Sequence, residues 1–182
     1  MVIIFVVFTL FLSAGSKSGQ EKRLAACQNN LQNIYAAFKT YSVDNNGALP
    51  ARPGARTSEV PLSELVPKYT TGTSFFVCPG GQGTPLPDAQ PFANKRISYA
   101  YYTSRKLDDG SGAPLMSDAQ VDTTAKSPGQ IVFSLDGKKP GNNHNKFGGN
   151  VLFCDGNVQF TPPRLAFPLP LATNGDLLNP KP

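Results

Sequence analysis

The residues of this chain that could do chemistry are one histidine, His144, and three cysteines. Cys27, Cys78 and Cys154 have no C-x-x-C spacing among them, and the single histidine adds only one side chain with nitrogen ligands. Structural zinc sites are built from closely spaced cysteine and histidine ligands. We therefore predict no metal site and no cofactor.

The cysteines have two other interpretations, and both stay open. In an oxidising compartment two of them can form a disulfide. Three pairings exist and the spacing does not choose among them, although a Cys27–Cys78 bond would tie an N-terminal helix to the rest of the chain. The second interpretation is that Cys27 and Cys154 are small, buried, apolar residues.

An enzyme would have to build its site around His144. An exported hydrolase or metal enzyme would add acidic residues at strand ends and in loops, where catalytic groups are often displayed, and the candidates are Asp136, Asp155 and Asp118. The sequence has no G-x-S-x-G, H-E-x-x-H or C-x-x-C motif, and Asp155 is explained by a turn. We therefore predict no catalytic residues and a protein that is not an enzyme.

The residues after His144 predict the clearest structural element. Two apolar segments flank Asp155-Gly156, a pair that tolerates the positive φ values of a type I′ turn, so residues 150–160 predict a β-hairpin. Its side chains should alternate between two faces, with Val151 and Phe153 on one and Leu152 and Cys154 on the other.

Three further segments are predicted to be strands. Residues 96–102 are rich in aromatic side chains, and residues 114–118 and 130–137 are short apolar segments that each end at an aspartate. The cluster Tyr99, Tyr101 and Tyr102 is the one aromatic group that an exposed binding patch would use. With 17 glycines and 17 prolines, the chain is rich in turns and loops.

A helix is predicted ahead of these strands. No glycine or proline interrupts residues 20–43, and Gly47 and Pro50 should stop the helix. Six residues follow one another at spacings of three and four and so form one narrow stripe: Leu24, Cys27, Leu31, Ile34, Phe38 and Tyr41. We expect this stripe to be a seam that packs on the chain's own sheet, on another copy, or on both along different lengths.

An apolar run, residues 2–12, precedes the helix and is shorter than the ~20 apolar residues that span a bilayer. It is either the centre of a secretory signal peptide, cleaved after residues 13–15, or the end of a longer membrane helix. A buried helix of a soluble protein is the third interpretation. We expect export or anchoring, with the chain from Gly47 onward outside the cytoplasm.

Composition favours one small exported domain of 182 residues with a net charge of +5. The basic excess of the helix suits anionic lipid or acidic patches on other copies, and the remaining basic residues form no nucleic-acid motif. We divide the chain into an apolar membrane or export segment with its link (1–19), a stem helix (20–46), a globular antiparallel β head (47–161) and a proline-rich C-terminal tail (162–182).

The order of these features resembles a known family. Residues 23–34, residues 41–47 and Pro50 look like the N-terminal helix of type IV pilin-like proteins and, more narrowly, of the bacterial prepilin-type processing-associated group. Further motifs of that group are matched in order by Cys78-Pro79, Ser98-Tyr99, Leu135-Asp136, and a closing element of His144, Gly148, Gly149, Asn150, Val151, Leu152, Phe153, Asp155 and Gly156. The resemblance runs from about residue 8 to residue 160.

The sequence departs from that group in two places. Ten residues separate His144 from Asp155 where the group has nine. At the front, Val7 stands where the group has the glycine cleaved by prepilin peptidase, and Leu12 stands where it has a glutamate. We expect the alignment that places Met1 inside the membrane helix and leaves the leader missing.

The resemblance implies an α+β, pilin-like fold, in which a long N-terminal helix packs on a small antiparallel sheet with long Pro/Gly-rich loops. It implies a non-enzymatic subunit of a pilus-like or type II secretion pseudopilus-like filament, anchored in the bacterial inner membrane with its head in the periplasm or outside the cell. Its partners would be copies of itself or other pilin-like subunits, bound through the helix, and the membrane, but no nucleic acid. The alternative is a membrane-anchored or secreted monomeric binding module.

Overall fold

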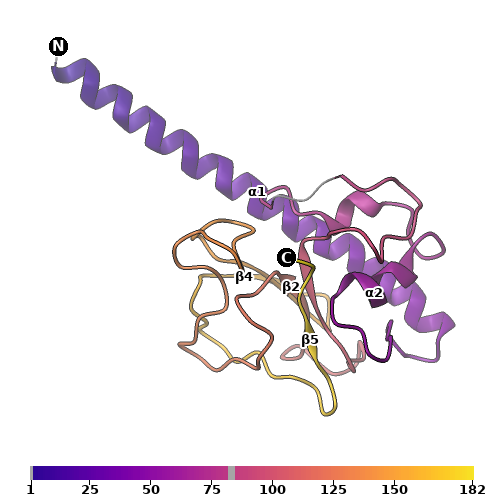
Figure 1. Cartoon of the computed structure of the whole chain (residues 1–182). Helices are drawn as coiled ribbons and strands as arrows, with labels where there is room; N and C mark the ends of the chain where they lie inside the picture. The colour runs from indigo at the N-terminus through magenta and orange to yellow at the C-terminus, as the bar shows by residue number, and fades with distance from the viewer. Residues whose placement is uncertain (1, 82–84) are drawn as a thin grey trace.

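Helix α1 (Val2–Asp44) is the longest element and crosses one side of the molecule in Figure 1. It ends where the backbone becomes left-handed at Asn46 and Gly47, and the Gly47 N–H donates to the Ser42 carbonyl oxygen over 2.8 Å. The predicted stop at Gly47 is therefore confirmed. The structure, a computed structural model, describes residues 2–81 and 85–182, with side chains described from residue 18 onward.

The rest of the chain forms three short helical turns and one sheet. The turns are α2 (Glu59–Leu62), η1 (Ser63–Leu65) and η2 (Thr73–Phe76). The strands are β1 (Tyr99–Tyr102), β2 (Pro114–Asp118), β3 (Gly149–Phe153), β4 (Val158–Thr161) and β5 (Leu177–Leu178). Every neighbouring pair is antiparallel, in the order β4-β3-β2-β1-β5.

Both faces of this sheet are buried, so the molecule has two apolar cores. Helix α1 covers the first face, where its side chains pack with Tyr99, Tyr101, Met116, Leu152 and Cys154. Irregular chain covers the second face, where the core contains Ala100, Tyr102, Val132, Phe133, Val151, Phe153, Leu165, Leu169 and Leu177. Successive strand residues alternate between the two cores, which confirms the predicted alternation in residues 151–154.

The head covers most of the stripe predicted on the helix. Four of its residues are fully buried against the head: Cys27, Leu31, Ile34 and Phe38. The Phe38 ring stacks on Tyr101 with 5.6 Å between ring centroids. Leu24 and Tyr41, at the two ends of the stripe, are half-buried. The chain's own sheet is therefore the partner of the stripe's middle part.

The N-terminal part of α1 projects away from the head, as Figure 1 shows. The Asn150 side chain still reaches the helix here, because its Nδ2 donates to the Leu24 carbonyl oxygen over 3.1 Å. Most residues from 18 to 26 are exposed or half-buried. We call residues 2–19 the projecting segment.

The pilin-like fold expected from the sequence needs correction. One long helix and an antiparallel sheet are compatible with the α+β class. Within the described part of the chain, however, no helix combines the length and the apolar character needed to cross a membrane. The physical reason is that residues 16–23, Ser-Lys-Ser-Gly-Gln-Glu-Lys-Arg, are polar and end the apolar run inside α1. The pilin-like form of the prediction is therefore wrong.

The strand predictions hold in part. β2 spans the predicted residues 114–118, whereas β1 is shorter than the predicted 96–102. The predicted strand 130–137 is wrong, because only an isolated bridge between Ile131 and Arg164 forms there. Its backbone donors find loop partners instead: the N–H groups of Val132 and Phe133 both donate to Pro163.

The C-terminal segment, residues 162–182, lies on the head. Its Leu177 and Leu178 form β5, which pairs with β1 at one edge of the sheet (Figure 1). Asn179 exchanges two hydrogen bonds with Gln120, donating to its carbonyl oxygen and accepting from its N–H. These bonds let a proline-rich segment, which cannot continue a sheet for long, cover the second core.

The predicted hairpin is confirmed as β3 and β4, but its turn is of another type. A type I′ turn needs positive φ at both central residues, and of Asp155 and Gly156 only Gly156 has one, at +87°. The Gly156 N–H donates to Phe153, whose own N–H donates to Asn157. This is a three-residue loop closed by a left-handed glycine.

Replacing Gly156 with valine is expected to destabilise the protein by about 1 to 3 kcal/mol, the usual range of backbone strain. The left-handed φ is strained for valine, and a Cβ at this position would lie 2.5 Å from Cε1 of Tyr35 on α1. Asp155→Asn is the control, since asparagine keeps the acceptor for the Asn157 N–H. Urea unfolding compares the two, and equal midpoints would contradict a constrained turn.

Candidate functional site

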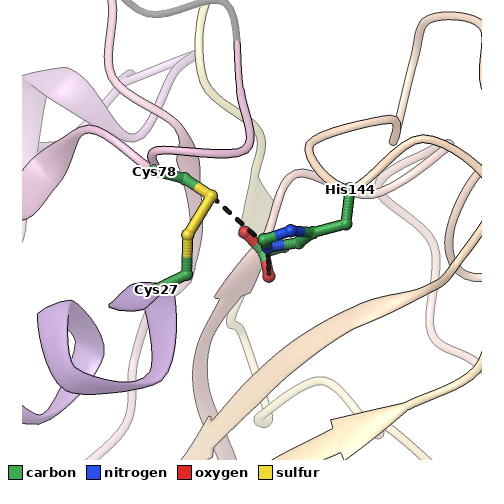
Figure 2. A group of neighbouring side chains, drawn as sticks. Cys27, Cys78 and His144 are labelled. Atoms are coloured by element: carbon green, nitrogen blue, oxygen red, sulfur yellow. Dashed lines mark hydrogen bonds and ion pairs between the residues drawn. A yellow bond between two sulfur atoms is a disulfide. The ribbon is translucent and has the colours of Figure 1, made fainter. Parts of the chain in front are cut away.

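A disulfide between Cys27 and Cys78 joins the stem to the head, and it is the centre of the candidate site (Figure 2). Cys27 lies on α1, and Cys78 follows η2 just ahead of Pro79. The two Cα atoms are 5.3 Å apart although 51 positions separate the residues in sequence. Of the three pairings left open by the sequence, the structure has this one, so Cys27 is not merely a small apolar residue.

His144 lies against this disulfide, and its ring points toward Cys78 in Figure 2. Its Nε2 atom lies 3.3 Å from Cys78 Sγ and 3.3 Å from an Asp118 carboxylate oxygen, Oδ2. Both His144 and Asp118 are fully buried. The structure thus brings the predicted candidates His144 and Asp118 together. The disulfide sulfur of Cys78 is the third member of this group.

Two asparagines hold the Asp118 carboxylate in place at the end of β2. The Asn143 side chain donates to Oδ1 over 2.8 Å, and the Asn150 backbone N–H donates to Oδ2 over 2.8 Å. Asn143 also donates to the Ser98 carbonyl oxygen, which fixes the loop that carries His144 against the start of β1. Asn143 could not be singled out from the sequence, because nothing distinguishes it from its neighbours in the polar loop.

Three glycines around the buried centre let neighbouring atoms lie where a Cβ would otherwise be. A Cβ at Gly80 would lie 2.6 Å from His144 Nδ1, and a Cβ at Gly149 would lie 3.0 Å from the Cβ of Asp118. Gly148 has φ +106°, and a Cβ there would lie 2.1 Å from the Thr161 carbonyl oxygen. The motif residues Gly148, Gly149 and Asn150 therefore act structurally, by seating β3 against the buried carboxylate.

The other acidic residues proposed for a hydrolase lie elsewhere. Asp155 is exposed in the β3–β4 loop, and Asp136 is exposed in the loop that follows Ser134. Hydrogen bonds from the Lys138 backbone N–H and the Ser134 hydroxyl lower the pKa of Asp136, so this carboxylate stays ionised. The buried group around His144 therefore contains Asp118, but neither Asp136 nor Asp155.

Cys154 and the tyrosine cluster are not available for surface chemistry. Burial raises the pKa of the Cys154 thiol to about 12, so it stays protonated, and its side chain is in the first core. Tyr99, Tyr101 and Tyr102 are all buried, and burial raises the pKa of each phenol. The exposed aromatic patch that a binding module would use does not form from these residues.

A cavity of about 440 Å³ lies next to the buried centre. Asn143 and Ser98 belong to its lining, so one asparagine contacts both the cavity and Asp118. Three basic residues, Arg96, Lys139 and Lys181, also line it, and its charge therefore suits an acidic ligand.

The arrangement at the disulfide can hold three parts of the fold together, namely the stem, the sheet and the loop of His144. Its four central side chains are at most 1 % exposed, so a substrate has no approach to them. Compared with known proteins, the chain matched no protein-family model, no curated protein and no solved structure.

Proposed function

We propose that this protein is a non-enzymatic structural subunit, in which the head is carried in an oxidising compartment and the N-terminal helix associates with other copies of the chain. The observation that carries this proposal is the continuity of α1. One unbroken helix of 43 residues is clamped to the head along its C-terminal part and leaves the projecting segment outside it (Figure 1).

The contacts between the stem and the head are strong enough to fix the direction of the projecting segment. Five buried residues of α1, Cys27, Leu31, Ile34, Ala37 and Phe38, and the Cys27–Cys78 disulfide fix the stem to the head. Tyr35 adds a hydrogen bond from its hydroxyl to the Cys154 carbonyl oxygen over 2.9 Å, and Asn30 adds one to the Val77 carbonyl oxygen over 3.1 Å. A helix held in this way leaves the head in a defined direction.

A partner would stabilise the projecting segment. An isolated helix of about 12 to 15 residues is marginal in water, because most helical stability comes from packing of one face. In sequence, residues 2–12 are apolar, so this segment has the apolar side chains that such packing requires. Every copy presents the same segment, and parallel copies would bury it against one another. We therefore take a second copy as the partner.

The disulfide supports the location of the head. Disulfides persist in oxidising compartments and are rare in the cytosol. The Cys27–Cys78 bond is buried at the junction of stem and head, which is typical of a structural disulfide. A head outside the cytoplasm, in the periplasm or beyond it, fits this chemistry.

Substituting Leu24 with aspartate tests the proposal. Leu24 is half-buried at the junction with the projecting segment, so we expect the head to stay folded while association between full-length chains weakens roughly tenfold. Amine-reactive crosslinking, for which exposed Lys22 and Lys39 are available, measures association, and thermal melting measures folding. Asn29→Asp is the control, because it adds the same charge at an exposed helix position away from the stripe.

A second candidate is a monomeric binding module, favoured by the basic cavity next to Asn143. Its occupant would carry carboxylate or phosphate groups that pair with Arg96, Lys139 and Lys181. The crosslinking experiment separates the two functions. If Leu24→Asp leaves crosslinked oligomers at the parental level, the helices of different copies do not associate at Leu24. The binding module is then the better account.

A further inference from the structure

The structure assigns to this chain a Zn²⁺ site that forms when the Cys27–Cys78 disulfide is reduced. Its ligands are Cys27 Sγ, Cys78 Sγ, His144 Nε2 and Asp118 Oδ2. One donor atom from each of these four residues lies within 4.8 Å of the others, and all four residues are buried. The site goes beyond the proposed assembly function and does not depend on it.

The distances fit a tetrahedral site. With Zn–S bonds of about 2.3 Å and Zn–N bonds of about 2.0 Å, tetrahedral angles place neighbouring ligand atoms roughly 3.3 to 3.8 Å apart. His144 Nε2 is already 3.3 Å from both Cys78 Sγ and Asp118 Oδ2. After reduction the two sulfurs must separate to about 3.8 Å. Rotation of the two side chains supplies that, because their Cα atoms are 5.3 Å apart.

A second observation points to a cation at this place. Asp118 is fully buried, and its Oδ2 atom lies 3.3 Å from His144 Nε2. Burying a carboxylate is costly unless hydrogen-bond donors or a cation compensate for the lost water. Asn143 and the Asn150 N–H already hydrogen-bond the carboxylate, as partners of a metal-binding carboxylate do.

The donor set selects the metal. Two thiolates and an imidazole favour Zn²⁺ over the harder Mg²⁺ and Ca²⁺, which take oxygen ligands. Cys154 stays outside the site, because it is buried in the first core as a free thiol. The three cysteines thus divide into one pair of ligands and one inert thiol.

The chemical balance links the two states of the site. A phosphine and one water molecule reduce the Cys27–Cys78 bond: the phosphine gives two electrons, and the water gives two protons to the thiols and its oxygen to the phosphine oxide. A dithiol instead gives two electrons and its own two protons, and becomes a disulfide. Binding of Zn²⁺ then releases the two thiol protons. The sulfur atoms of Cys27 and Cys78 cannot form the disulfide and bind the metal at the same time. In the chain before oxidation, the metal would therefore hold the stem and the head together.

Cobalt titration of the full chain tests the site. Protein purified under a phosphine reductant should bind one Co²⁺ per chain and show the thiolate-to-cobalt band and strong visible bands of a tetrahedral site, which Zn²⁺ then abolishes. The oxidised chain should show none of these bands. Cys154→Ala should keep them, whereas Cys78→Ser and Asp118→Asn should lose the tetrahedral spectrum. Circular dichroism of each sample reports whether the head is folded.

Three results would overturn the site. The first is a reduced parental chain that binds no Co²⁺, whether folded or not, because metal binding and folding are coupled at such sites. The second is a tetrahedral spectrum from a chain that circular dichroism shows to be unfolded. The third is loss of the bands in Cys154→Ala with the head still folded, which would make Cys154 a ligand in place of the four assigned residues.

Discussion

Replacing Leu31 with aspartate is expected to unfold the head. Leu31 is fully buried in the core between α1 and the sheet. The change removes apolar burial worth roughly 1.5 to 3 kcal/mol and adds a buried, unpaired carboxylate that costs several more. Domains of this size are stable by about 5 to 15 kcal/mol in total. Thermal unfolding followed by circular dichroism should therefore show no cooperative transition.

The control for this prediction is the next residue on the helix. Gln32 is exposed, so Gln32→Asp adds the same charge to the same turn of α1 without burying it, and it should melt close to the parental chain. If Leu31→Asp melted at the parental temperature as well, the stem would not pack on the sheet in solution.

Loss of the disulfide is the second change with a large expected effect. Cys78→Ser should lower the free energy of unfolding by about 4 kcal/mol, because the bond closes a loop between residues 51 positions apart and so restricts the unfolded chain. Urea unfolding without reductant, with a chelator present to exclude metal, measures the loss.

The reductant itself supplies the matched control. Adding a phosphine should lower the stability of the parental chain to the level of Cys78→Ser and leave Cys78→Ser unchanged. Cys154→Ala should still respond to the reductant, since Cys154 is a free thiol. A parental chain with the same midpoint in both conditions would show that the stem is not held by this bond.

Sequence patterns predicted the elements that depend on local chemistry. Residues 114–118 are an apolar segment between turns and form β2 over the predicted residues. Asp155-Gly156 between two apolar segments predicted the hairpin, and alternation placed its side chains on the correct faces. The stop of the helix at Gly47 was predicted for the same reason, since left-handed backbone favours glycine.

The same patterns failed where tertiary packing decides. Residues 131–133 are as apolar as a strand, yet Val132 and Phe133 fill the second core from a loop, and their N–H groups donate to Pro163. Apolar character reports burial and does not report which backbone groups pair. The prediction of a pilin-like fold was wrong for a related reason. It rested on the order of short motifs, whereas the polar residues 16–23 end the apolar run within α1.

The sequence predicted single residues of the candidate site, but not the site itself. His144, Asp118 and the two cysteines were each singled out, but they come from four separate segments and no spacing in the sequence encodes their meeting. Nothing in the sequence marks Gly80, although the side chain of His144 leaves no room for a Cβ there.

Sedimentation velocity of the oxidised full-length chain measures association through the N-terminal part of α1, from the projecting segment to Leu24. Over a hundredfold range of protein concentration, we expect particles that grow beyond the 19.4 kDa of one chain, and smaller particles for Leu24→Asp at each concentration. A non-specific apolar aggregate would not respond to that single change. A particle of 19.4 kDa at every concentration would contradict the claim.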